Sequence, residues 1–281
     1  MKLLRMGPIG RERPCMLDPE GRARLLDGIV SDIGGDALSD AGLDRLRAID
    51  PRSLPVVPEG TRIGPCVAGT TKIICIGLNY ADHAAESGMQ VPPEPVLFMK
   101  AVSSIAGPDD DVPIPPGAEK VDWEVELGVV IGRRCKRVAE ADALDYVAGY
   151  CVTNDLSERA WQLERQGNWS KGKSHDGFAP LGPWLVTKDE VPDPQNLRLW
   201  LDVDDRRLQD GSTRTLVYGV RTLVAYISNF MTLLPGDVIS TGTPPGVGFG
   251  QKPQVYLRTG QRMALGIDGL GVQHQRTVND T

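Results

Sequence analysis

Acidic residues at every second position make residues 121–131 the segment of this chain that bears most directly on chemistry. Asp122, Glu124 and Glu126 alternate with apolar residues, which predicts a strand with one buried face and all three carboxylates on the other. Carboxylates roughly 7 Å apart along a strand repel one another, and a bound cation would relieve that repulsion. A solvated sheet face shows the same alternation, so this segment alone leaves both interpretations open.

Asp155 adds a further carboxylate at the end of a strand predicted over residues 146–153. One interpretation makes it the N-cap of the helix expected after it. The other makes it a third metal ligand beside Glu124 and Glu126. Three carboxylates without sulfur or imidazole would select a hard ion, Mg²⁺, Mn²⁺ or Ca²⁺.

His83 and Glu86 form a candidate acid–base pair. They follow a buried strand expected at residues 72–77 and fall in a short helix predicted over residues 79–88. Residues three apart share a helix face, and a carboxylate beside an imidazole orients it and raises its basicity. Such a pair suits a general base that activates water, although a surface ion pair explains the same spacing.

The segment Gly167–Ser174 matches the phosphate-loop pattern G-x-x-x-x-G-K-S. That pattern indicates a nucleotide only between a strand and a helix. Here residues 160–166 are helical in character and residues 175–183 cannot begin a helix, so we reject a nucleotide-binding function. Lys173 is left as a cation for an anionic substrate or an enolate, or as a solvated loop lysine.

Three further polar residues are candidates for holding a substrate. Arg159 and Gln162 would share one face with Asp155 on a helix expected over residues 157–165. Arg159 suits a carboxylate and Gln162 could donate to a carbonyl oxygen, although an isolated arginine is usually solvated. Thr243 belongs to the glycine-rich loop 241–250, which either holds a carboxylate or forms a tight structural turn.

The predicted elements indicate a mainly β, α+β architecture. Residues 1–68 read as a small β-rich N-terminal domain, and residues 69–281 as the larger catalytic domain. The expected strands in the second part lie at residues 72–77, 121–131, 146–153, 184–187, 197–203 and 238–240. A helix is expected within residues 216–233, where apolar residues recur at helical spacing.

Composition excludes several classes of function. The net charge of −6 argues against nucleic acid, whose binding needs a basic face, and no apolar run is long enough to span a membrane. The five cysteines show no CxxC spacing, which is typical of reduced thiols. Residues 1–14 lack the apolar core of a signal peptide, so we expect a cytoplasmic protein.

The order and spacing of several motifs resemble the fumarylacetoacetate hydrolase family over about residues 70–281. The motifs are IGLNYADHAAE (76–86), EPVLFMK (94–100), WEVELGVVIG (123–132), YVAGYCVTNDLSER (146–159), GKS (172–174), APLGPWLVT (179–187), LLPGDVISTGTPPGVG (233–248) and GIDGLG (266–271). The resemblance implies a mixed β-sandwich roll, a divalent metal (Mg²⁺, Mn²⁺ or Ca²⁺) and a homodimer or higher homo-oligomer.

Carried over residue by residue, the family pattern assigns a role to each candidate. It makes Glu124, Glu126 and Asp155 the metal ligands, His83 and Glu86 the water-activating pair, and Lys173 the catalytic lysine. It places the remaining candidates in the substrate pocket: Lys100, Arg159, Gln162 and Thr243. Longer members carry an Asp where this chain has Asn79, and many relatives have a Phe where it has His175.

The implied reaction is hydrolysis of a carbon–carbon bond in a 2,4-diketo acid of the acylpyruvate type, giving pyruvate and a carboxylic acid. Residues 2–22 are similar to members that act on 2,4-diketo-3-deoxy sugar acids such as the rhamnonate or fuconate derivatives. The same metal–enolate chemistry would also support an oxaloacetate decarboxylase, a muconate-type isomerase or a ureidoglycolate lyase. A non-catalytic binder of small acids is the alternative from another class.

Overall fold

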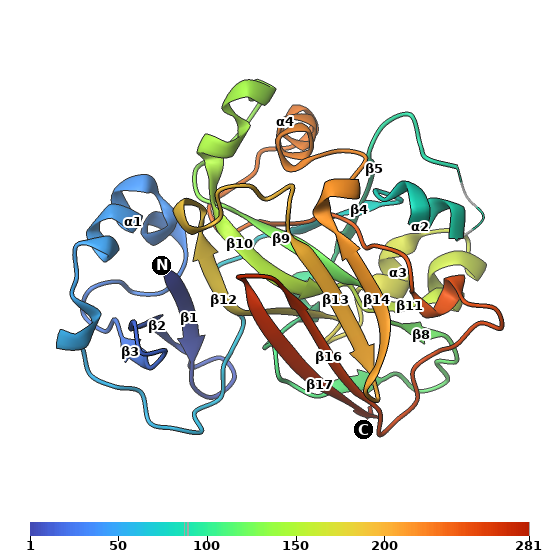
Figure 1. The fold of residues 1–281 in the computed structure, drawn as a ribbon, viewed down its shortest axis with the longest axis horizontal. Coiled ribbons are helices and arrows are strands. Elements are labelled where there is room, and N and C mark those ends of the chain that lie inside the picture. The colour runs from blue at the N-terminus through green and yellow to red at the C-terminus, as the bar shows by residue number, and fades with distance from the viewer. Residues whose placement is uncertain (87, 89, 281) are drawn as a thin grey trace.

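The computed structural model of the chain describes residues 1–86, 88 and 90–280, and these residues form a mainly β, α+β protein (Figure 1). The strands are β1 Lys2–Met6, β2 Arg13–Leu17, β3 Ala23–Leu25, β4 Ile73–Gly77, β5 Val96–Lys100, β6 Ile105–Ala106, β7 Val112–Ile114, β8 Val121–Asp122, β9 Val125–Ile131, β10 Val147–Asn154, β11 Ser157–Glu158, β12 Ala179–Thr187, β13 Arg198–Val203, β14 Arg206–Ser212, β15 Val238–Ser240, β16 Arg262–Ile267 and β17 Gly271–Asn279. The predicted fold class is confirmed.

The helices are few and short. The α-helices are α1 Asp40–Arg47, α2 Ala81–Glu86, α3 Trp169–Lys173 and α4 Val220–Phe230, and a π-helical turn covers Ala160–Glu164. Short 3₁₀ helices cover Gly35–Leu38, Pro51–Ser53, Val102–Ser104, Glu140–Tyr146, Lys188–Glu190, Thr213–Thr215 and Gly248–Gly250. No helix in the described ranges is long and apolar enough to cross a membrane.

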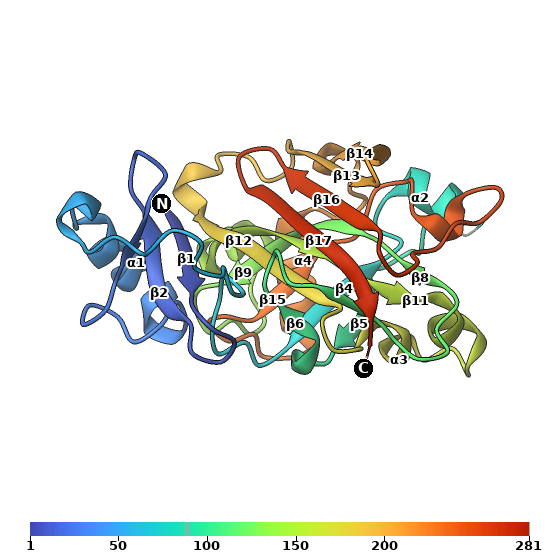
Figure 2. The ribbon, with the colours of Figure 1, turned by 90° about the horizontal axis from the view of Figure 1, so that it is seen from below.

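Two sheets pack face to face. A ten-stranded sheet has the order β3-β2-β1-β12-β10-β9-β15-β4-β5, with β6 beside β12, and a five-stranded sheet has the order β14-β13-β16-β17-β7. Figures 1 and 2 show β16 and β17 running across the larger sheet. Leu127 and Val129 of β9 share one buried cluster with Leu201 of β13 and Leu265 of β16. This cluster is the core of a β-sandwich.

The strand at residues 121–131 differs from its prediction in two ways. Every residue of β9 is buried, because its odd-numbered side chains enter the sandwich core and Val130 enters a second cluster on the other face. The strand is also interrupted at Trp123 and Glu124. There the amide N–H of Glu124 donates to the side chain of Asn154 and that of Val125 donates to Gln209, so side chains replace strand partners.

The N-terminal segment extends the main sheet, because β1 pairs with β12 (Figure 1, blue). Leu43 and Leu46 of helix α1 pack in one cluster with Leu181 of β12. The division of the chain at residue 68 stays a prediction.

The prediction of a helix over residues 157–165 is wrong for the first half of that segment. Ser157 and Glu158 form β11, which pairs with β8, and the π-helical turn begins only at Ala160. The carboxylate of Glu158 accepts the N–H of Trp161 at 2.6 Å and so satisfies the start of that turn. Asp155 therefore caps no helix, and it does not share a helix face with Arg159 and Gln162.

Candidate active site

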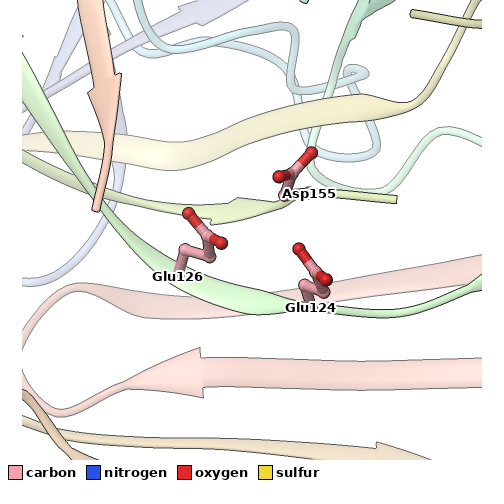
Figure 3. Close-up of side chains that lie close together, drawn as sticks. All are labelled: Glu124, Glu126 and Asp155. Carbon is pink, nitrogen blue, oxygen red and sulfur yellow. The ribbon is translucent and has the colours of Figure 1, made fainter. Parts of the chain in front are cut away.

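The carboxylates of Glu124, Glu126 and Asp155 converge, as Figure 3 shows. One oxygen from each lies within 4.8 Å of the others, and all three residues are buried. Strand pairing explains the convergence, because β9 and β10 run antiparallel with Val125 opposite Asn154. Asp155, one residue beyond β10, thereby lies beside the two glutamates.

Three buried cations surround these carboxylates. Lys173 Nζ donates to Glu124 and to Asp155, at 2.7 Å in each case. Lys100 Nζ donates to the other oxygen of Asp155 and to the carbonyl of Leu156. Burial opposes the charge on Lys173, but Asp155 and Glu124 outweigh it and raise the pKa of this lysine, which remains an ammonium.

Arg159 joins the cluster to a fourth carboxylate. Its Nη2 donates to Glu124 at 2.6 Å, its Nε to Asp122 at 2.8 Å, and its Nη1 to the side-chain oxygen of Gln162 at 3.1 Å. Burial would raise the pKa of Glu124, but Lys173 and Arg159 hold it below its usual range. The guanidinium is thus engaged by the protein itself at all three nitrogens.

Glu126 is the carboxylate without a cationic partner. Its Oε2 accepts from the Ser240 hydroxyl at 2.6 Å and the Gly242 N–H at 2.9 Å, whereas its Oε1 has no hydrogen-bond donor in the described part of the chain. Burial, followed by the charges of Asp155 and Glu124, raises the pKa of Glu126. One oxygen of this side chain is therefore free to bind a cation.

The donor set fits a hard divalent cation. The cluster holds four carboxylates, from Asp122, Glu124, Glu126 and Asp155, and three cations, from Lys100, Arg159 and Lys173, which leaves one formal negative charge. All candidate ligand atoms are carboxylate oxygens, the type that Mg²⁺, Mn²⁺ and Ca²⁺ prefer.

His83 and Glu86 lie on α2, and His83 lines the same pocket as Glu124 and Glu126. His83 Nδ1 is 3.4 Å from Glu86 Oε2, and both oxygens of Glu86 accept the N–H of Gly246 at 3.0 Å. The glycine-rich loop thus holds the carboxylate of Glu86. An added Cβ at Gly246 would lie 1.8 Å from the Leu208 carbonyl oxygen, so only glycine fits there.

The pocket, with a volume of about 40 Å³, brings together most of the predicted site residues. Gln162, Arg159, Lys173 and Thr243 line it, with His83 and two of the acidic residues. The hydroxyl of Thr243 is already engaged, because it donates to the Val125 carbonyl and accepts from Gln209. Neither Lys100 nor Asp155 is among the residues that line the pocket, and Lys100 holds the Asp155 carboxylate in place.

Asp122 is the functional candidate to which the sequence assigned no role. It is fully buried and accepts from four donors: the N–H groups of Trp123, Gly248 and Phe249 and the Nε of Arg159. It therefore ties the glycine-rich loop to the carboxylate cluster. The sequence feature that could have identified Asp122 is its position as the first acid in the alternating segment 121–131.

Asn79 is the residue at which the family resemblance implies an aspartate in longer members. Its amide donates to the carbonyls of Tyr218 and Thr241 and accepts the N–H of Tyr218. All its polar atoms are thus used to join two loops.

The family match decides the identity of this fold and site. The fumarylacetoacetate (FAA) hydrolase C-terminal family matches residues 72–278. The chain belongs to the fumarylacetoacetate hydrolase family. A curated relative from Burkholderia ambifaria, which carries the provisional name of a hydrolase, is 65% identical over 280 residues, with 99% of each chain covered.

Solved structures of the fumarylacetoacetate hydrolase family include both hydrolases and isomerases. A maleylpyruvate hydrolase from Sphingobium sp. SYK-6, in complex with manganese(II) ion and pyruvate, is 29% identical, with a TM-score of 0.82 and both chains fully covered. A 5-carboxymethyl-2-hydroxymuconate delta-isomerase from Mycobacterium smegmatis is 32% identical, with a TM-score of 0.78 and the same coverage.

Proposed function

We propose that this protein is a metal-dependent hydrolase that cleaves a carbon–carbon bond in a 2,4-diketo acid, giving pyruvate and a carboxylic acid. The observation that carries the proposal is a pocket lined both by Glu124 and Glu126, two members of the buried carboxylate triad, and by His83, whose ring nitrogen faces Glu86. The first suits a hard cation and the second suits the activation of water. The manganese and pyruvate bound to the maleylpyruvate hydrolase support the same reaction class.

Glu124, Glu126 and Asp155 would hold the ion. When bound, a divalent ion would supply Lewis-acid stabilisation of the negative charge that develops on the keto acid. Lys173 would add a fixed positive charge beside the same position.

His83 activates the water. Glu86 orients the ring through Nδ1, which leaves Nε2 as the nitrogen that takes a proton from water. The hydroxyl adds to the distal carbonyl carbon C4, the C3–C4 bond breaks, and its electron pair passes to the enolate of pyruvate. Protonation of C3 then completes pyruvate, and C4 becomes the carboxylic acid.

Gln162 stabilises the oxygen that becomes negative when water adds. Its Oε1 accepts from Arg159, and its Nε2 has no partner within the described residues. Because Arg159 fixes one end of the amide, the other end is oriented to donate to a substrate oxygen.

Removal and return of the metal tests the proposed reaction. Chelator-treated protein should release no pyruvate from 2,4-dioxopentanoate, and added Mg²⁺ or Mn²⁺ should restore turnover, measured by coupling to lactate dehydrogenase. Equal rates with and without chelator would contradict the metal dependence. Metal-dependent binding of several 2,4-diketo acids without pyruvate would indicate a non-catalytic binder.

His83→Ala should lower kcat by about 10²–10⁴-fold, the usual contribution of a general base. Metal affinity should stay within about twofold of the wild type, because His83 is not among the acidic ligands. Steady-state kinetics and calorimetric Mn²⁺ titration measure the two quantities. A variant that turns over at the wild-type rate would remove His83 from the mechanism.

A further inference from the structure

We propose that the acyl group of the diketo substrate is uncharged, so that the substrate carries a single carboxylate. This inference rests on the proposed function and narrows its substrate class. It follows from the cations of the pocket, its walls and its charge balance.

Both cations that line the pocket are already bound to the protein's own carboxylates. Arg159 uses all three guanidinium nitrogens on Asp122, Glu124 and Gln162, and Lys173 bridges Glu124 and Asp155. The face of Arg159 is also covered, because the ring of Phe249 lies 5.7 Å from its guanidinium carbon. Neither cation is free to pair with a carboxylate at the acyl end of a substrate.

Apolar side chains make up the rest of the wall. They are Ile76, Leu78, Phe98, Leu163, Trp169 and Phe249. Phe98 and Trp169 meet edge to face at 5.2 Å, and the Trp169 ring lies so close to Gly77 that an added Cβ there would be 2.5 Å from it. This packing fixes a largely aromatic surface that suits an uncharged acyl group.

Among the described residues, no lysine or arginine other than Arg159 and Lys173 lines the pocket. Residues 84–95, which follow His83, contain no Lys, Arg or His. Lys252 lines a neighbouring groove together with Glu86 and Phe249. Its side chain is exposed in that groove and does not line the pocket that holds the carboxylates.

The net charge of the carboxylate cluster also favours a substrate with a single carboxylate. The cluster has one formal negative charge, which a divalent ion would convert to one positive charge. A substrate with one carboxylate neutralises that charge. A second carboxylate would be buried without a cationic partner, which is strongly unfavourable.

Two diketo acids of equal length test the inference. In 7-methyl-2,4-dioxooctanoate an isopropyl group stands where 2,4-dioxoheptanedioate has its second carboxylate, so the pair differs mainly in charge. With Mn²⁺-loaded wild-type protein, kcat/KM for 7-methyl-2,4-dioxooctanoate should be at least about tenfold higher than kcat/KM for 2,4-dioxoheptanedioate. Tenfold is a cautious lower limit, because an unpaired buried charge usually costs more than this ratio represents. An equal or higher kcat/KM for the dicarboxylate would overturn the inference while the proposed function stood.

Lys252→Ala provides the matched control. This variant should leave kcat/KM for both substrates unchanged. A selective loss with the dicarboxylate would identify Lys252 as the partner of a second carboxylate and would overturn the inference. If neither compound, nor 2,4-dioxopentanoate, yields pyruvate with Mg²⁺ or Mn²⁺, the proposed function itself fails and this inference fails with it.

Discussion

Glu126→Gln should abolish metal-dependent turnover and leave the metal-free protein folded. Glu126 is the one acid of the described triad without a lysine or arginine partner, so its neutral isostere leaves no cation unpaired. The glutamine oxygen can accept from Ser240 and Gly242 as Oε2 does now. Replacing this acid also removes a carboxylate whose pKa is raised by burial and then by the charges of Asp155 and Glu124.

Glu126→Gln should lower kcat/KM by at least about 10³-fold, because the variant loses the rate acceleration that the metal supplies as a Lewis acid. Thermal unfolding without metal should occur at or above the wild-type temperature, and added Mn²⁺ should no longer raise it. Glu119→Gln is the matched control, because Glu119 is exposed and its side chain lies outside the site. A Glu126→Gln protein with wild-type Mn²⁺ affinity would contradict the ligand assignment.

Asp155→Ala should damage both the site and the fold. Asp155 accepts from Lys173 and Lys100, and all three side chains are buried. Removing the carboxylate leaves Lys100 with only a carbonyl partner, and an unpaired buried charge costs about 3–5 kcal/mol. We therefore expect this loss in the free energy of unfolding, measured with urea, together with the loss of turnover.

The double variant Lys100→Met/Asp155→Ala separates the two effects. It removes both members of the buried pair, so its stability should recover by at least about 1 kcal/mol relative to Asp155→Ala. Turnover should remain absent, because the ligand is still missing. Wild-type stability of Asp155→Ala, or renewed turnover in the double variant, would contradict the roles given to these side chains.

Local patterns predicted the parts of the site that depend on local geometry. The alternation over residues 121–131 indicated that Glu124 and Glu126 point the same way, and the spacing of His83 and Glu86 indicated a shared helix face. Contacts between distant segments were not encoded locally. Arg159 reaches Asp122 across 37 positions because β11 pairs with β8, and Lys100 reaches Asp155 across 55.

Strand β17 shows why part of the fold was missed. Its buried face carries Gln273 and Gln275, where an apolar residue would have marked a strand. Gln273 Nε2 donates to the carbonyls of Val152 and Gly182, and Gln275 Nε2 to that of Pro108, so these amides satisfy backbone groups between the sheets. Alternation of apolar residues cannot reveal a strand whose inner face is polar.

Several expectations from the sequence stay predictions. They are the catalytic and binding roles of the site residues, the domain boundary at residue 68, the homodimer or higher homo-oligomer, and the cytoplasmic location.

Anomalous diffraction from crystals grown with Mn²⁺ and pyruvate tests the central claim most directly. We predict one strong manganese peak among the carboxylates of Glu124, Glu126 and Asp155, with oxygen ligands at about 2.0–2.3 Å. If crystals at a Mn²⁺ concentration that supports turnover showed no peak there, the carboxylate triad would not be the metal site.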